Sequence, residues 1–349
     1  MYLAEGRRTT RRARARSFAA PLLRVALAIA ALWALRRELS GVGMGTLLAH
    51  LRAYGWTHVT LGVACTVGSF LVLGVVEILA LQHADGTSPH RVPRRSALGT
   101  SFVANALSQS IGVSVLTGAA VRVRGYARYG LDAAAVARTT AFVTITATIG
   151  VLAAAAVALV MAPAPIVIGS VVIAARAVAV AFVAIVATYL VWSAAGRGDG
   201  IGRGRWRLPR PSLGIAASQV LLSTIDWLLA GSVLFAFMPT HVGLSYGVVL
   251  GAYMIAQTTA MTSHVPGGAG VFELVVLALL GSSAPTADRA ALVAALVMFR
   301  VVYYLVPLGA AIVMAGAVEL ARARGTASRA HIEAGRRPSH LELWAQRAD

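Results

Sequence analysis

Long apolar runs, separated by short polar segments, make up most of this chain. Each run holds about 20 residues, enough for one helix to cross a hydrocarbon core of about 30 Å. The runs are continuous and rich in Ala, Leu and Val, without the alternation that barrel strands require, so they predict helices. We therefore predict an all-α, polytopic integral membrane protein with about eight transmembrane helices, plus a re-entrant or broken helix in each half. The predicted spans are residues 18–37, 57–82, 133–162, 164–193, 213–237, 243–262, 263–283 and 289–317.

A further apolar stretch, residues 96–118, carries many polar residues, among them Asn105. If it crossed the membrane fully, Arg122, Arg124 and Arg128 would lie on the opposite side from the other Arg-rich segments. A helix that enters the membrane and returns keeps these segments on one side. Irregular backbone at membrane depth is tolerated where it is buried in protein or lines a wet cavity. We therefore predict a re-entrant or broken helix here.

A second interrupted segment lies in the other half of the chain, at residues 257–273. Pro266 removes a backbone N–H donor and disfavours helix at the residue before it. Gly267, Gly268 and Gly270 permit a turn in a conformation that other residues avoid. One such interrupted segment in each half is typical of transporters with a binding site near the membrane midplane.

The charged residues refine this picture through their positions. The formal net charge is +18, and all 31 residues counted as Lys or Arg are Arg. They gather at the ends of apolar runs, which indicates topology and contact with anionic headgroups rather than nucleic acid, for which no motif is present. If both termini are cytoplasmic, all Arg-rich segments lie on that side. The predicted organisation is a basic cytoplasmic tail (1–17), a transmembrane domain (18–317) with a cytoplasmic Gly/Arg linker (194–212), and a cytoplasmic C-terminal tail (318–349).

Five charged residues fall deep within the predicted spans. Asp226, Glu273 and Arg300 are the strongest functional candidates, because a charge at the centre of a membrane helix costs about 2.5–3.5 kcal/mol on insertion scales. They are expected to line a polar cavity and to bind a headgroup or exchange a proton. The alternative is a satisfied ion pair that only fixes helix packing. Arg176 lies near the middle of its predicted span and Glu77 nearer the inner end of its own.

Arg122, Arg124 and Arg128 directly follow the first broken segment, interleaved with Tyr residues. The planar guanidinium suits phosphate, so contact with lipid phosphate is one reading, and positive-inside topology is the other. His264, beside the glycine turn, is expected either to serve the cavity or to cap the turn. No metal-ligand spacing is present, and we expect neither a metal nor a cofactor.

These same residues resemble a known family. The stretch from Ser263 to Glu273, SHVPGGAGVFE, is similar to the signature of the lysylphosphatidylglycerol synthase transmembrane-region family, which includes the flippase half of the bacterial multiple peptide resistance factor. Three more stretches look similar in the same order, together spanning about residues 100–310: Asn105 to Leu131, Asp226-Trp227, and the run RVVYYLVP from Arg300 to Pro307. The resemblance implies a core that moves anionic or aminoacylated phospholipids between leaflets. It departs from the bifunctional members, because only about 32 residues follow the last predicted span and leave no room for a synthase domain.

The predicted function is a phospholipid flippase of the bacterial inner membrane, without enzyme activity of its own. A membrane enzyme acting on a lipid-linked substrate and a non-catalytic membrane assembly factor are the alternatives. Membrane phospholipids are the expected partners, nucleic acid is not, and the oligomeric state stays open, with a homodimer as one option. The candidate substrate-binding residues are Asn105, Arg122, Arg124, Arg128, Asp226, His264, Gly267, Gly268, Gly270, Glu273, Arg300 and Tyr303.

Overall fold

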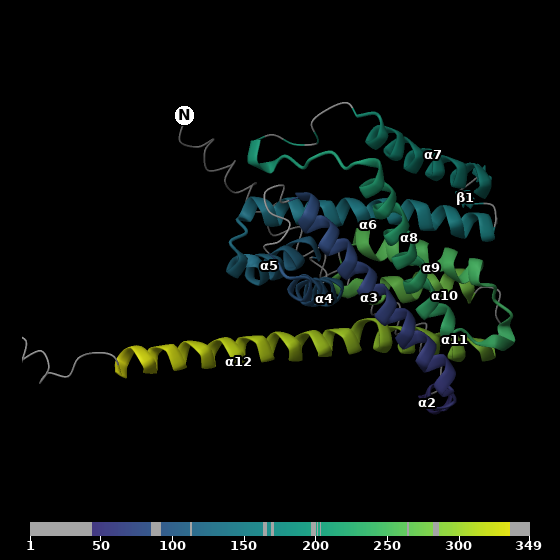
Figure 1. Ribbon diagram of the computed structural model, residues 1–349. Helices are drawn as coiled ribbons and strands as arrows, with labels where there is room; N and C mark the ends of the chain where they lie inside the picture. The colour runs from purple at the N-terminus through teal and green to yellow at the C-terminus, as the bar shows by residue number, and fades with distance from the viewer. Residues whose placement is uncertain are drawn as a thin grey trace, which may run out of the picture.

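The computed structural model describes most of the chain as a bundle of helices (Figure 1). The residues that it describes are 44–84, 92–111, 114–162, 166–168, 171–196, 200, 202, 204–263, 265–281 and 286–335, with side chains up to residue 320. The predicted first span (18–37), the tail at 1–17 and His264 lie outside these residues.

Five helical segments among the described residues are long and apolar enough to cross a membrane. The prediction of an all-α polytopic membrane protein is thereby confirmed. These segments are α3 (Trp56–Ala84), α6 (Ala133–Met161), α7 (Ala175–Ala194), α8 (Leu213–Ala236) and the continuous run of α11 (Thr286–Arg300), the π-helix η5 (Val301–Leu305) and α12 (Val306–Gly335). The remaining helices are α2 (Met44–Arg52), α4 (Arg94–Ile111), α5 (Ser114–Tyr126), α9 (Tyr246–Ser263), α10 (Val271–Leu280) and the short turns η1 (Ala127–Tyr129), η2 (Gly204–Trp206), η3 (Thr240–Val242) and η4 (Pro266–Gly268).

The structure differs from the predicted spans at two places. Residues 164–193 do not form one helix, because strands β1 (Ile166–Ile168) and β2 (Val171–Ile173) pair antiparallel before α7 begins at Ala175. Two prolines precede this hairpin, and its β-branched residues favour extended backbone. The predicted span 263–283 contains the turn η4 and the ten-residue α10, which is about 15 Å long and too short to cross a hydrocarbon core.

The segment at 96–118 is interrupted, as the sequence predicts, because α4 ends at Ile111 and α5 begins at Ser114. α4 and α5 lie next to each other as a helical hairpin (Figure 1). A Cβ atom on Gly118 would lie 2.8 Å from the Ser108 hydroxyl oxygen, and one on Gly125 would lie 2.7 Å from Thr100. The two pairs run in opposite sequence directions, so the two helices are antiparallel and their backbones approach closely.

A buried ion pair fastens this hairpin to α3. The Arg122 guanidinium on α5 donates three hydrogen bonds of 2.7–3.0 Å to the Glu77 carboxylate, and the Tyr126 hydroxyl donates a fourth of 2.8 Å. The side chains of Arg122 and Glu77 are 5% and 0% exposed. We expected Arg122 to contact lipid phosphate, but its partner is Glu77, 45 residues away in sequence, and the pair is sealed within the protein.

We predict that Arg122→Ala strongly destabilises the fold. The substitution leaves the Glu77 carboxylate buried without a cation, which typically costs about 3–5 kcal/mol. The measurement is the free energy of unfolding in mixed detergent micelles, followed by circular dichroism. Arg124→Ala is the matched control, because the Arg124–Glu319 pair is exposed, at 71% and 45%, and its loss should change stability little.

The double variant Glu77→Leu/Arg122→Leu should recover most of the lost stability, because it removes both buried charges together. Equal losses in Arg122→Ala and Arg124→Ala would contradict this account of the hairpin.

Candidate functional site

The centre of the candidate site is the glycine turn between α9 and α10. Gly267, Gly268 and Gly270 have φ values of 59°, 60° and 83°, in the left-handed region that favours glycine. Val265, before Pro266, is extended, as proline requires of the residue that precedes it. The predicted turn that only glycine tolerates is therefore present.

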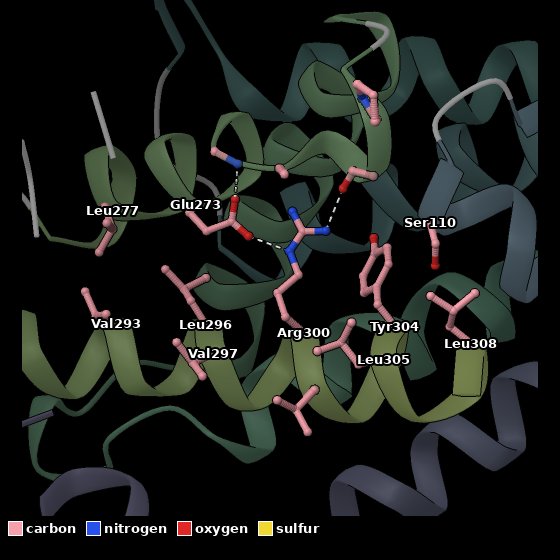
Figure 2. Close-up of a pocket in the computed structure, with 15 residues that line it drawn as sticks. Ser110, Glu273, Leu277, Val293, Leu296, Val297, Arg300, Tyr304, Leu305 and Leu308 are labelled. Atoms are coloured by element: carbon pink, nitrogen blue, oxygen red, sulfur yellow. Dashed lines mark hydrogen bonds and ion pairs between the residues drawn. The ribbon is translucent and has the colours of Figure 1, made fainter. Parts of the chain in front are cut away.

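Arg300, at the end of α11, ties this turn to the start of α10 (Figure 2). Its Nε donates to the Glu273 carboxylate, while Nη1 and Nη2 donate to the carbonyl oxygens of Gly267 and Gly268 at 2.5 and 3.2 Å. The other Glu273 oxygen accepts from the Gly270 N–H at 2.7 Å, in the first turn of α10, where the helix dipole favours an anion. One arginine thus supplies hydrogen-bond donors to the Gly267 and Gly268 carbonyl oxygens of an irregular backbone segment.

Aromatic rings flank the Arg300 guanidinium. Its central carbon lies 4.7 Å from the centre of the Tyr304 ring and 5.4 Å from that of Phe272, within the range of cation–π attraction. The Tyr304 hydroxyl contacts the Gln257 side-chain oxygen on α9 at 3.3 Å. The cation is therefore held by charge, by backbone carbonyls and by ring faces together.

The Arg300–Glu273 pair lies on the wall of a cavity of about 470 Å³ (Figure 2). The tip of α4 also reaches this cavity, since a Cβ atom on Gly267 would lie 3.2 Å from the Ser110 carbonyl oxygen. The two interrupted segments of the chain therefore meet. Apart from the charged pair, the side chains on the wall are mostly apolar. The lining residues are Ser110, Pro266, Gly267, Ala269, Gly270, Glu273, Leu277, Val293, Leu296, Val297, Arg300, Val301, Tyr304, Leu305 and Leu308.

Asp226 and Tyr303 belong to a separate polar cluster. The Ser69 hydroxyl on α3 donates to the Asp226 carboxylate at 2.5 Å and lies 3.1 Å from the Tyr303 hydroxyl. Neither Asp226 nor Tyr303 is among the residues that line the cavity. The expected trio of Asp226, Glu273 and Arg300 is therefore divided, with only the last two on the cavity wall.

The remaining predicted residues lie away from the cavity wall. Asn105 donates to the Ser101 carbonyl oxygen within α4 at 2.9 Å. Arg128 donates to the Ser96 hydroxyl at 3.0 Å and lies over the Tyr129 ring. Arg124 pairs with Glu319 at the surface. Arg176, expected near mid-span, lies in the first turn of α7 because that helix begins at Ala175.

Three residues of these clusters escaped sequence reasoning as candidates. Ser69 is one hydroxyl in a long apolar helix, and Ser110 is one of several polar residues in its segment. Tyr304 lies next to Tyr303, which was the predicted residue of the two. Tyr303 and Tyr304 are adjacent in the π-helix Val301–Leu305 and point in different directions, so they contact different groups. Among the described residues, no three His, Cys, Asp or Glu side chains gather as a metal site.

Together these observations define a multi-pass α-helical membrane protein in which two interrupted segments meet at a charged cavity. The chain belongs to the family of the lysylphosphatidylglycerol synthase TM region, whose model matches residues 22–311.

Three relatives illustrate the range of similarity. An uncharacterized protein of Synechocystis sp. is 29% identical over 303 residues, covering 85% of this chain and 91% of the relative. The inner membrane protein YbhN of Escherichia coli is 26% identical over 260 residues, covering 74% and 79%. A phosphatidylglycerol lysyltransferase of Staphylococcus epidermidis is 35% identical over 95 residues, covering 27% of this chain and 11% of the relative.

We predict that Gly268→Ala destabilises the protein, whereas Gly251→Ala does not. A Cβ atom on Gly268 would lie 2.6 Å from the Ala260 Cβ, at a φ that costs a non-glycine residue about 1–2 kcal/mol before any clash. Gly251 lies within α9 with open space around it, so alanine there should stabilise the helix by up to about 1 kcal/mol. Thermal unfolding in detergent measures both, and a Gly268→Ala protein as stable as wild type would refute the strained turn.

Proposed function

We propose that this protein moves a phospholipid between the two leaflets, with the headgroup passing the Arg300–Glu273 pair. The observation that carries the proposal is a charged pair on the wall of a mostly apolar cavity of about 470 Å³ in a membrane-spanning bundle. Such a wall matches a molecule with a charged head and apolar chains. Ionisable residues within a membrane protein mark a substrate path by default, because their burial is otherwise costly.

The chemistry of the pair suggests how a headgroup is accepted. A lipid phosphate presents two oxygen acceptors to the planar fork of a guanidinium, as the Glu273 carboxylate does, so it can take that carboxylate's place on Arg300. Glu273 is then free to accept a cationic group, such as the ammonium of an aminoacylated headgroup. With an aminoacylated headgroup the exchange keeps every charge partnered, which matters because an unpaired buried charge costs about 3–5 kcal/mol.

The same exchange loosens the glycine turn. Arg300 donates to the carbonyls of Gly267 and Gly268, and a phosphate competes for these donors. Glycine residues at positive φ can absorb the dihedral changes of a hinge. Headgroup binding would thereby release the segment at which the two interrupted helices meet.

The relatives support the lipid class and the location. Staphylococcal and Bacillus relatives are named phosphatidylglycerol lysyltransferases, and the Escherichia coli relative is named an inner membrane protein. We therefore propose phosphatidylglycerol or its aminoacylated form as substrate and the bacterial inner membrane as location, with both termini cytoplasmic. The proposed role is transport rather than chemical conversion of the lipid.

The test is movement of fluorescent phosphatidylglycerol between leaflets in proteoliposomes. Wild type should move the lipid faster than protein-free vesicles, and Arg300→Gln should slow it about tenfold or more, since a hydrogen bond to a charged group contributes about 1.5–3 kcal/mol. Arg124→Gln is the matched control, because Arg124 lies at the surface. Equal rates in Arg300→Gln and wild type would refute this role of the cavity.

A comparison of two lipids separates the two roles of the pair. Glu273→Gln should slow lysyl-phosphatidylglycerol more than phosphatidylglycerol, because it removes the negative charge that pairs with the ammonium group, whereas Arg300→Gln should slow both. The assay is the same, with matched fluorescent lipids. Equal effects of Glu273→Gln on both lipids would contradict the proposed contact with a cationic headgroup.

A further inference from the structure

Asp226 is a carboxylic acid within the bundle, and no cation among the described residues pairs with it. It lies in the membrane-spanning helix α8, and its hydrogen bond comes from Ser69, which is 0% exposed. Among the described residues, the guanidinium groups that form buried ion pairs are committed to Glu77 and Glu273, and none pairs with Asp226. An ionised carboxylate there is an unpaired charge in apolar surroundings, and proton uptake removes that charge.

A chain of polar groups leads from Asp226 toward the cavity. Ser69 links the carboxylate to the Tyr303 hydroxyl, and Tyr303 in turn interacts with the side-chain amide of Gln109 at the tip of α4. The Gln109 Oε1 atom is buried without a hydrogen-bond partner among the described residues. The next residue, Ser110, lines the cavity.

We propose that Asp226 is a proton-binding site that couples proton movement to lipid translocation, with Ser69 and Tyr303 as the relay. This inference rests on the proposed function. When Asp226 is ionised, Tyr303 donates to Ser69 and Ser69 donates to the carboxylate. When a proton enters through Tyr303, each hydroxyl passes one proton on and receives one, so Asp226 becomes protonated and both hydroxyls are restored. Release reverses these steps and needs no other reactant.

The donor set fits a proton better than a metal ion. The oxygen groups gathered there are one carboxylate and two hydroxyls, whereas calcium takes six to eight oxygen ligands and magnesium six. Hydroxyls can both donate and accept, which a relay requires. In the part of the chain that the structure describes, the titratable groups that interact with Asp226 are Tyr303 from η5 and Tyr253 from α9.

The π-helix connects this cluster to the lipid site. Tyr303 bonds toward Ser69, while its neighbour Tyr304 lies over the Arg300 guanidinium and contacts Gln257. The Phe299 ring stacks on Tyr303 and contacts Tyr304 edge-on, so the rings form one packed unit. A shift of Tyr303 on protonation of Asp226 therefore moves the groups that hold Arg300.

The experiment combines lipid movement with infrared spectroscopy. In proteoliposomes, an imposed gradient of one pH unit should change the wild-type rate of phosphatidylglycerol movement by up to about tenfold, the factor that such a gradient supplies. Asp226→Asn and Tyr303→Phe should move the lipid at rates that do not respond to the gradient. Tyr246→Phe is the matched control, because Tyr246 bonds to the Leu228 carbonyl outside the relay, and it should keep the full response.

The infrared measurement reads the proton independently of transport. Wild type should show a protonated-carboxyl band that titrates with pH and is absent from Asp226→Asn. A missing band, or an unchanged gradient response in Asp226→Asn, would overturn the inference. If that variant does not fold, Ser69→Ala and Tyr303→Phe test the relay, and an unchanged gradient response in both would overturn it. A wild-type protein that moves no lipid would overturn the proposed function and the coupling with it, and the band alone would still decide whether Asp226 binds a proton.

Discussion

The Arg300 side chain is the constraint on which the site depends. It donates hydrogen bonds to a carboxylate and to two backbone carbonyl oxygens of the glycine turn. These carbonyls lie outside a regular helix, so they do not belong to its hydrogen-bond pattern. In a membrane protein each unpaired backbone group costs several kcal/mol, so an irregular segment needs such a donor. The glycines allow the backbone conformation of the turn, and the arginine stabilises it by donating hydrogen bonds to its carbonyl oxygens.

Among the described residues, three carboxylates within the bundle differ in what they can respond to. Glu77 is closed off by Arg122 and Tyr126, so nothing in solution competes for it. Glu273 is paired with Arg300 on a cavity wall, where a ligand with the same chemistry can take its place. Asp226 has hydroxyl partners, which can pass protons. The degree of closure, more than the charge itself, therefore separates the structural role of Glu77 from the roles proposed for Glu273 and Asp226.

The sequence predicts the helical membrane fold, the returning segment at 96–118 and the glycine turn, because each depends on local composition or backbone chemistry. It does not predict which charges pair. Glu77 and Arg122 are 45 residues apart, and Ser69 and Asp226 are 157 apart, so only the packing of α3 against its neighbours joins them. The β-hairpin before α7 was also missed, since a short apolar run fits strand and helix alike.

The two interrupted segments meet at the cavity but are held in different ways. The α4–α5 hairpin is fastened to α3 by the sealed Arg122–Glu77 pair, which a headgroup cannot reach. The turn between α9 and α10 is held by Arg300, whose donors a phosphate can claim. In the proposed mechanism, opening on ligand binding therefore takes place at the glycine turn, with the α4 tip as the fixed wall. Because the ring of Tyr304 lies on the same arginine, and Tyr303 beside it belongs to the Asp226 cluster, the proposed proton and headgroup sites share one packed group of side chains.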